Sequence, residues 1–134
     1  MSARRMRTLV VLWGFALVVG TAPASATPSA PRPLSPADSA SVTLPFTISW
    51  SAASDASGIL AYNWQVSASS TFAKISRQDS VMAPATGDVV SGLAVGTYFW
   101  RVQAVSNDFV QGPWSTARRV KVTGAGAGLP ATPT

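Results

Sequence analysis

Residues 93–105 carry the strongest pattern in this chain. After Gly96, polar or aromatic residues alternate with apolar ones, and the apolar positions are Tyr98, Trp100, Val102 and Ala104. Successive side chains of a β-strand point to opposite faces, so a period of two predicts a strand with one buried side and one solvent-facing side. A tyrosine just inside a strand, with Leu93 in the preceding turn, is also typical of β-sandwich corners. The segment therefore predicts a β-sandwich.

The same alternation recurs along the chain. It covers 44–50, through Leu44, Phe46, Ile48 and Trp50, and 62–68, through Tyr62, Trp64, Val66 and Ala68. Weaker or shorter strands are predicted at 72–81, 88–90 and 117–122, and no helical periodicity occurs beyond the first residues. Short strands separated by polar turns predict an all-β sandwich. Its inner packing is expected to come mostly from Trp50, Tyr62, Trp64, Tyr98 and Trp100.

The two ends differ in composition from the middle. Three arginines, an apolar run at 9–19 and the sequence Ala24-Ser25-Ala26 predict a secretory signal peptide over 1–26. The run is shorter than the ~20 residues that a membrane span needs, so the mature chain is expected to be secreted and free of the membrane. We expect a Pro-rich lead-in at 27–33, one domain at 34–123, and a Gly/Ala/Pro/Thr linker tail at 124–134.

The charge of the chain gives no support for nucleic-acid binding. The full sequence has ten Lys and Arg against five Asp, a net charge of +5. Loss of Arg4, Arg5 and Arg7 with the leader leaves seven cations against five carboxylates, a net charge of +2. Nucleic-acid binding needs a clustered basic surface, and so small an excess does not predict one.

The sequence lacks Cys, His and Glu altogether. Disulfides, nucleophilic Ser-His-Asp or Cys-His sites and ordinary zinc sites are therefore excluded. A mechanism that uses paired Asp side chains stays open as an alternative, but four of the five Asp are expected in turns or loops, where Asp commonly accepts backbone hydrogen bonds. We expect no enzyme activity, no cofactor and no metal.

The order of these motifs resembles a fibronectin type III domain of the kind found in secreted bacterial proteins. The resemblance rests on Trp50, on Tyr62-x-Trp64-x-Val66, on Leu93 followed by Tyr98-x-Trp100-x-Val102-x-Ala104, and on Gly112-Pro113-Trp114-Ser115. It implies an immunoglobulin-like, seven-stranded antiparallel sandwich over nearly the whole mature chain, without a cofactor or catalysis. It also implies a hydrogen bond from the Tyr98 hydroxyl to backbone near Leu93. Trp114-Ser115 resembles half of the repeated Trp-Ser motif of cytokine-receptor domains, in which Trp rings stack with Arg; this resemblance implies one contact between Trp114 and an arginine.

In such a sandwich, the strands at 62–68, 98–104 and 120–122 lie in one sheet, so their outward residues share a surface. The candidate ligand-binding residues on it are Asn63, Gln65, Phe99, Arg101, Gln103, Arg119 and Lys121. An aromatic ring offers an apolar platform and amides pair with hydroxyls, which suits a sugar or a polar peptide. The alternative interpretation is a solvated sheet face whose charges discourage aggregation.

These observations predict a secreted, non-catalytic module that binds an extracellular protein or polysaccharide and is itself a monomer. A second interpretation is a structural spacer, or a fragment of a larger extracellular protein, with no ligand of its own.

Overall fold

The computed structural model describes residues 27–124. The predicted leader at 1–26, and the predicted tail apart from Gly124, lie outside these residues. The described part holds eight strands: β1 (Pro33–Ser35), β2 (Ala40–Val42), β3 (Phe46–Trp50), β4 (Ile59–Ser67), β5 (Ile75–Met82), β6 (Gly87–Val90), β7 (Gly96–Ser106) and β8 (Arg118–Val122). Within it, no helix is long and apolar enough to cross a membrane.

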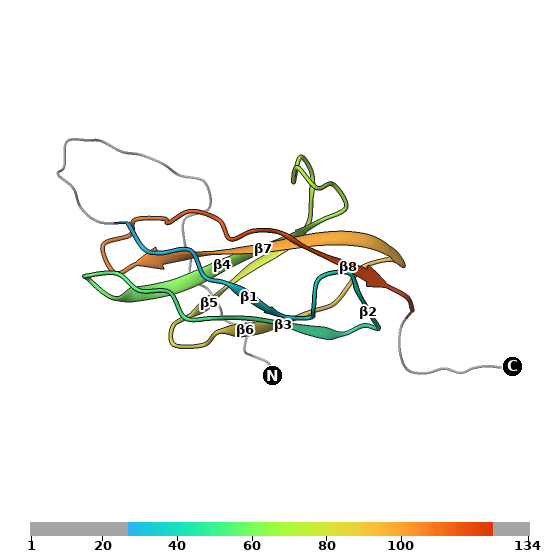
Figure 1. Ribbon diagram of the computed structural model, residues 1–134, viewed down its shortest axis with the longest axis horizontal. Helices are drawn as coiled ribbons and strands as arrows, with labels where there is room; N and C mark the ends of the chain where they lie inside the picture. Colours follow the sequence, from blue (N-terminus) through green and yellow to red (C-terminus); the bar gives the residue numbers. More distant parts are fainter. Residues whose placement is uncertain (1–26, 125–134) are drawn as a thin grey trace, which may run out of the picture.

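The strands form two sheets that face each other across the core (Figure 1). The smaller sheet has the order β1-β3-β6, and the larger one has the order β2-β8-β7-β4-β5. The alternating segments became the central strands β3, β4 and β7, because only a strand covered on one face requires strict alternation. The chain enters the described fold at one end of the sandwich and leaves it at the other.

The all-β sandwich is confirmed, but the expected count of seven strands in a wholly antiparallel arrangement is wrong. The first strand is divided between the two sheets: β1 pairs antiparallel with β3, whereas β2 pairs parallel with β8. Pro36 lies between them and has no backbone N–H for a ladder hydrogen bond, so pairing stops there and the chain crosses to the other sheet.

The core lies between the two sheets and is built mostly from the predicted inward residues. Ala68 is an exception, because β4 ends at Ser67 and Ala68 is exposed. All five of the expected aromatic side chains are buried in the core, with Val66, Val102, Val120 and Val122 beside them. Trp50 of the smaller sheet meets Tyr62 of the larger one in a tilted arrangement, with ring centroids 5.5 Å apart. Each such ring removes roughly 150–250 Å² from water, which is how the domain holds together without a disulfide.

Two tyrosine hydroxyls tie the core to the loops around it. The Tyr98 hydroxyl donates to the carbonyl oxygen of Ala94 at 2.8 Å, so the predicted bond to backbone near Leu93 is confirmed one residue further on. The Tyr62 hydroxyl accepts a hydrogen bond from the backbone N–H of Ala53 at 3.0 Å. Each ring thereby buries its apolar body while its polar tip remains hydrogen-bonded.

The Pro-rich segment at 27–33 packs on the fold. Pro28 is buried, and the Ser29 N–H donates to the Ser54 carbonyl oxygen at 3.0 Å. β1 then begins at Pro33. The lead-in therefore runs along the sandwich before the first strand starts.

Candidate ligand-binding face

The larger sheet brings the predicted site residues to one side. Asn63 lies opposite Gln103 and Gln65 opposite Arg101 in the β4–β7 ladder. Phe99 lies opposite Arg119 in the β7–β8 ladder, and Lys121 follows two residues along β8. The residues between them point into the core, so all seven share the outer face of this sheet.

Two of the seven are buried. Asn63 is 0% and Gln103 4% exposed, so the expectation that both amides meet a ligand is corrected. The Asn63 Nδ2 group donates to Gln103 Oε1 at 3.0 Å, and Asn63 Oδ1 accepts from the Ser80 hydroxyl at 2.7 Å. The two amides instead form a buried polar network that links β5, β4 and β7.

The segment that follows β7 explains the burial of Gln103. Its backbone continues the pairing with β7, through N–H donation from Gly112 to the Ala104 oxygen and from Ser115 to the Val102 oxygen. The Gly112 carbonyl oxygen accepts from Gln103 Nε2 at 2.9 Å. A Cβ at Gly112 would lie 2.6 Å from the Pro28 carbonyl oxygen, so only glycine lets the lead-in pack this closely.

Arg101 is the centre of a stack on the same face. Its Cζ lies 4.1 Å from the Phe72 ring centroid and 4.3 Å from that of Trp114. Its Nε and Nη2 groups both donate to Gln65 Oε1, at 3.0 and 2.8 Å. Burial lowers the pKa of the guanidinium below its ordinary value, but arginine stays protonated in proteins. The predicted contact between Trp114 and an arginine is confirmed.

Phe72 is the part of this face that the sequence did not reveal. A weak strand was expected from residue 72, but β5 begins only at Ile75, and Phe72 lies in the preceding loop. There it adopts a φ of 58° and reaches back over Arg101, so that it is only 8% exposed. Because Phe72 lies outside any alternating run, the sequence pattern did not predict that it would lie on the outer face.

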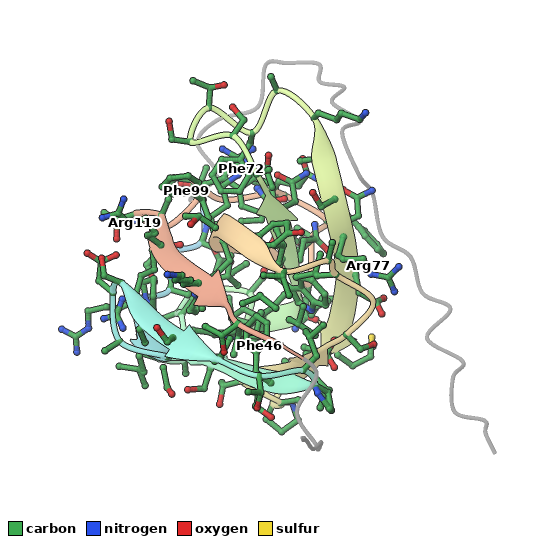
Figure 2. All side chains as sticks on the ribbon, turned by 90° about the vertical axis from the view of Figure 1, so that its right-hand side faces the viewer. Phe46, Phe72, Arg77, Phe99 and Arg119 are labelled. Atoms are coloured by element: carbon green, nitrogen blue, oxygen red, sulfur yellow. The ribbon has the colours of Figure 1, made fainter. Side chains whose placement is uncertain are left out.

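The exposed part of the face lies beside this stack. Phe99 is half-buried, whereas Arg119 and Lys121 are exposed. Figure 2 shows the sandwich from one end, with Arg119 and Phe99 at the left, Phe72 near the top and Arg77 at the right. The neighbouring Arg118 is held by the fold, since its Nη1 group donates to the carbonyl oxygens of Leu34 and Pro36.

The Asp side chains serve the fold in several ways. Asp55 Oδ2 accepts from the N–H and hydroxyl of Ser57, and Asp38 Oδ1 accepts from the Arg119 N–H. The expectation of four Asp in turns is corrected, because Asp79 lies in β5 and Asp88 in β6, where Asp88 accepts from Trp64 Nε1 at 2.8 Å. Among residues 27–124, no three His, Cys, Asp or Glu side chains gather as metal ligands would.

Comparison with known proteins identifies the fold. No protein-family model matches the sequence, and the search of curated proteins gave no match. Among solved structures, fibronectin(III)-like modules of Clostridium thermocellum CbhA match with a TM-score of 0.56 and 16% identity, over 75% of this chain and 49% of that one. This chain thus spans about half the length of that structure.

A human structure gives the same result. The fibronectin type III domain of human fibronectin type III domain containing protein 3 matches with a TM-score of 0.53 and 17% identity, over 78% of this chain and 94% of that one. The described residues therefore have the immunoglobulin-like sandwich fold of fibronectin type III modules. A shared fold does not assign a ligand, which must be argued from the site.

Proposed function

We propose that this chain is an exported, non-catalytic module that binds an extracellular polysaccharide through the outer face of its larger sheet. The contact residues are Phe99, Arg119 and Lys121, with Gln65 and Arg101 behind them. In dilute solution the module acts as a monomer. A polar peptide of an extracellular protein is the alternative occupant of the same face.

The observation that carries this proposal is the stack of Phe72, Arg101 and Trp114 on the outside of the sheet. It holds a guanidinium between two rings and leaves the Phe99 side chain beside it. A ring presented next to fixed hydrogen-bonding groups can stack on the apolar face of a sugar while its neighbours pair with hydroxyls. Rigid support of such a platform lowers the entropy lost on binding.

Export and the absence of catalysis are supported by the residue types. The basic start, the apolar run and Ala24-Ser25-Ala26 form a leader pattern, and cleavage after Ala26 would leave Thr27 as the first residue. Without His, Cys or Glu, few side chains can transfer protons near neutral pH. Intact-mass analysis of secreted protein tests the first point, since the proposal expects a mature chain that starts at Thr27.

The binding test uses residues 27–134, which contain the whole described fold. The protein is mixed with insoluble polysaccharides and with cell-wall preparations, at low and at moderate salt. We expect saturable retention that survives moderate salt and is lost when Phe99→Ala and Arg119→Ala are combined. The matched control combines Thr47→Ala and Val89→Ala, which change the exposed face of the smaller sheet.

The outcomes separate the candidate functions. Retention that the control variant keeps and the Phe99→Ala, Arg119→Ala variant loses supports the polysaccharide proposal. Retention that disappears with salt alone, or that both variants keep, contradicts it. If the protein is retained only by the cell-wall preparations, and if protease treatment of those preparations abolishes the retention, the face binds a protein instead.

A spacer is the second candidate, and the closure of the polar network favours it. The Asn63, Gln103 and Ser80 side chains satisfy one another, and Arg101 directs two donors to Gln65. These polar groups already have hydrogen-bond partners within the domain, so they do not need a ligand to complete them. The spacer interpretation predicts a domain that unfolds cooperatively and is retained by nothing in the test above.

A further inference from the structure

The two most exposed large hydrophobic side chains in residues 27–124 lie at opposite ends of the sandwich. Val95 is 67% and Phe109 66% exposed. Phe109 follows the end of β7, near the start of β4, because Ile59 pairs with Ser106. Val95 precedes the start of β7, where Gly96 pairs with Val122 at the end of β8. Phe109 and Val95 therefore expose apolar surface to solvent at opposite ends of the sandwich.

The loop that carries Phe109 is rigidly held. The Ser106 hydroxyl accepts from the N–H groups of Asp108 and Val110, at 3.1 and 3.2 Å. The Phe109 N–H donates to the Ser106 carbonyl oxygen at 2.8 Å. Phe109 itself has a φ of 66°, a left-handed conformation that a bulky residue rarely adopts. Backbone strain of this kind is a recognised mark of functional positions.

A second loop braces the first. The Asn107 N–H donates to the Gly58 carbonyl oxygen at 2.9 Å, and its Nδ2 group donates to the Ser57 carbonyl oxygen at 2.8 Å. Gly58 has a φ of 92°, and a Cβ there would lie 2.7 Å from Asn107 Nδ2. The two loops are thus hydrogen-bonded to each other, and Phe109 is exposed on the surface that they form.

The charges at the two ends are opposite in sign. The loops at the Phe109 end, residues 51–58, 83–86 and 107–113, contain Asp55 and Asp108 and no Lys or Arg. Arg32 lies at the border of this end, where its N–H donates to the Ser51 hydroxyl. We call this surface the acidic end.

The Val95 end has the opposite character. Its loops, residues 43–45, 68–74 and 91–95, contain Lys74 and no Asp or Glu, and Lys121 lies near the end of β8. Arg77 lies against the 91–95 loop, since a Cβ on Gly92 would be 3.3 Å from its Cζ. Figure 2 looks onto this end and shows Arg77 at one edge and Arg119 at the other. We call this surface the basic end.

We propose that the acidic end of one copy of this chain docks on the basic end of another. Phe109 packs against Val95 and its loop, while Asp108 faces Lys121 or Arg77. Apolar contact supplies the attraction, and the opposite charges set the orientation and disfavour pairing of like ends. The contact uses neither Phe99, Arg119 nor the Phe72–Arg101–Trp114 stack. Lys121, near the end of β8, is the one residue that it shares with the proposed binding face.

The small ends of the sandwich determine how strong this contact can be. Stable interfaces bury about 1,200–2,000 Å² in total, and contacts below that range are weak and transient. Self-association is therefore expected only at high local concentration, which is consistent with a monomer in dilute solution. The two docking surfaces differ, so the contact is heterologous and leads to open rows of modules.

The test uses two variants of residues 27–134, each blocked at one end. Asp108→Lys with Phe109→Asn blocks the acidic end, and Val95→Asp blocks the basic end. Asn tolerates a left-handed φ, so the first variant is expected to keep its fold. The ¹⁵N-labelled acidic-end variant is titrated to millimolar concentration with the unlabelled basic-end variant, and amide chemical shifts are recorded.

We expect saturating shift changes in the 91–95 loop and at Lys121, reduced at high salt, and none when the unlabelled partner is the acidic-end variant itself. Cooperative thermal unfolding of both variants confirms that they are folded. An absence of shift changes in the mixed titration overturns the proposal, as do equal changes in the control titration. Neither result bears on the polysaccharide test, because Phe99 and Arg119 are unchanged in both variants.

Discussion

The two faces of the larger sheet use aromatic side chains in different ways. On the inner face, Tyr62, Trp64 and Trp100 are buried among apolar neighbours from both sheets. On the outer face, Phe72 and Trp114 enclose the Arg101 guanidinium. The inner rings are held by the exclusion of water, whereas the outer ones are held by a cation and its hydrogen bonds.

This difference shows where sequence variation can occur without loss of the fold. The inner face must keep its volume and shape, since cores are close-packed. On the outer face, only the buried amide network and the stack contribute substantially to stability. The residues beside them are therefore available to contact a ligand. Substitutions should therefore cost much stability inside, less in the network, and little at the proposed contact residues.

The largest effect is expected inside. Trp50 is 1% exposed and packs on Tyr62, so Trp50→Ala should lower the free energy of unfolding by about 3–5 kcal/mol. Urea denaturation followed by fluorescence or circular dichroism measures this loss. Thr47→Ala, an exposed change on the same strand, is the control and should cost about 0.5 kcal/mol or less. A Trp50→Ala loss as small as that of the control would contradict the core assignment.

A smaller loss is expected in the buried network of the outer face. Asn63→Ala leaves the Ser80 hydroxyl and the side-chain Oε1 of Gln103 without their partner, which should cost about 2 kcal/mol. Gln103→Ala and the double variant complete a double-mutant cycle. Because the two amides act together, the double variant should lose less than the sum of the single losses. Additive losses would show that the network is not a unit.

The stack should contribute less again. Arg101→Lys keeps the charge but removes the planar group between Phe72 and Trp114 and the paired donors to Gln65, at a cost of about 1 kcal/mol. Thermal unfolding of Arg101→Lys measures the cost, and Arg119→Lys, an exposed change on the same face, is the control. Equal melting temperatures for the two variants would mean that the stack adds nothing to stability.

The smallest effect on stability is expected at the contact residues. Arg119 is exposed and Phe99 half-buried, so Phe99→Ala with Arg119→Ala should cost about 1 kcal/mol or less. Equilibrium unfolding in urea provides the value. A loss comparable to that of Trp50→Ala would show that Phe99 and Arg119 are needed for folding. The inner and outer faces of the larger sheet would then not differ as described.

Much of the fold was predictable because alternation is a direct consequence of one-sided burial. β3, β4, β7 and β8 follow from it, as do the inward residues of the core. The division of the first strand was not predictable. β1 and β2 have three residues each, and the sheet that each joins is determined by pairing with β3 and β8, which lie further along the chain. Such pairing is a property of the assembled sandwich.

The candidate site was predictable in its placement and less so in its exposure. The alternation correctly predicted that Asn63 and Gln103 lie on the outer side. It cannot distinguish a solvent-exposed face from one that is covered by another segment. The covering segment meets Gln103 through the Gly112 carbonyl oxygen, a backbone group that no side-chain pattern reveals. Phe72 was missed for a related reason, since a loop residue reaches the face only through its tertiary position.

The most direct test of the contrast between the two faces is an amide chemical-shift titration of ¹⁵N-labelled residues 27–134. The titrant is a soluble fragment of whichever polysaccharide retains the protein. We predict saturating changes confined to the outer face of the larger sheet, at Gln65, Phe99, Arg119 and Lys121. Changes centred on the smaller sheet or on the end loops, or no changes at all, would contradict the assignment of the outer face as the binding site.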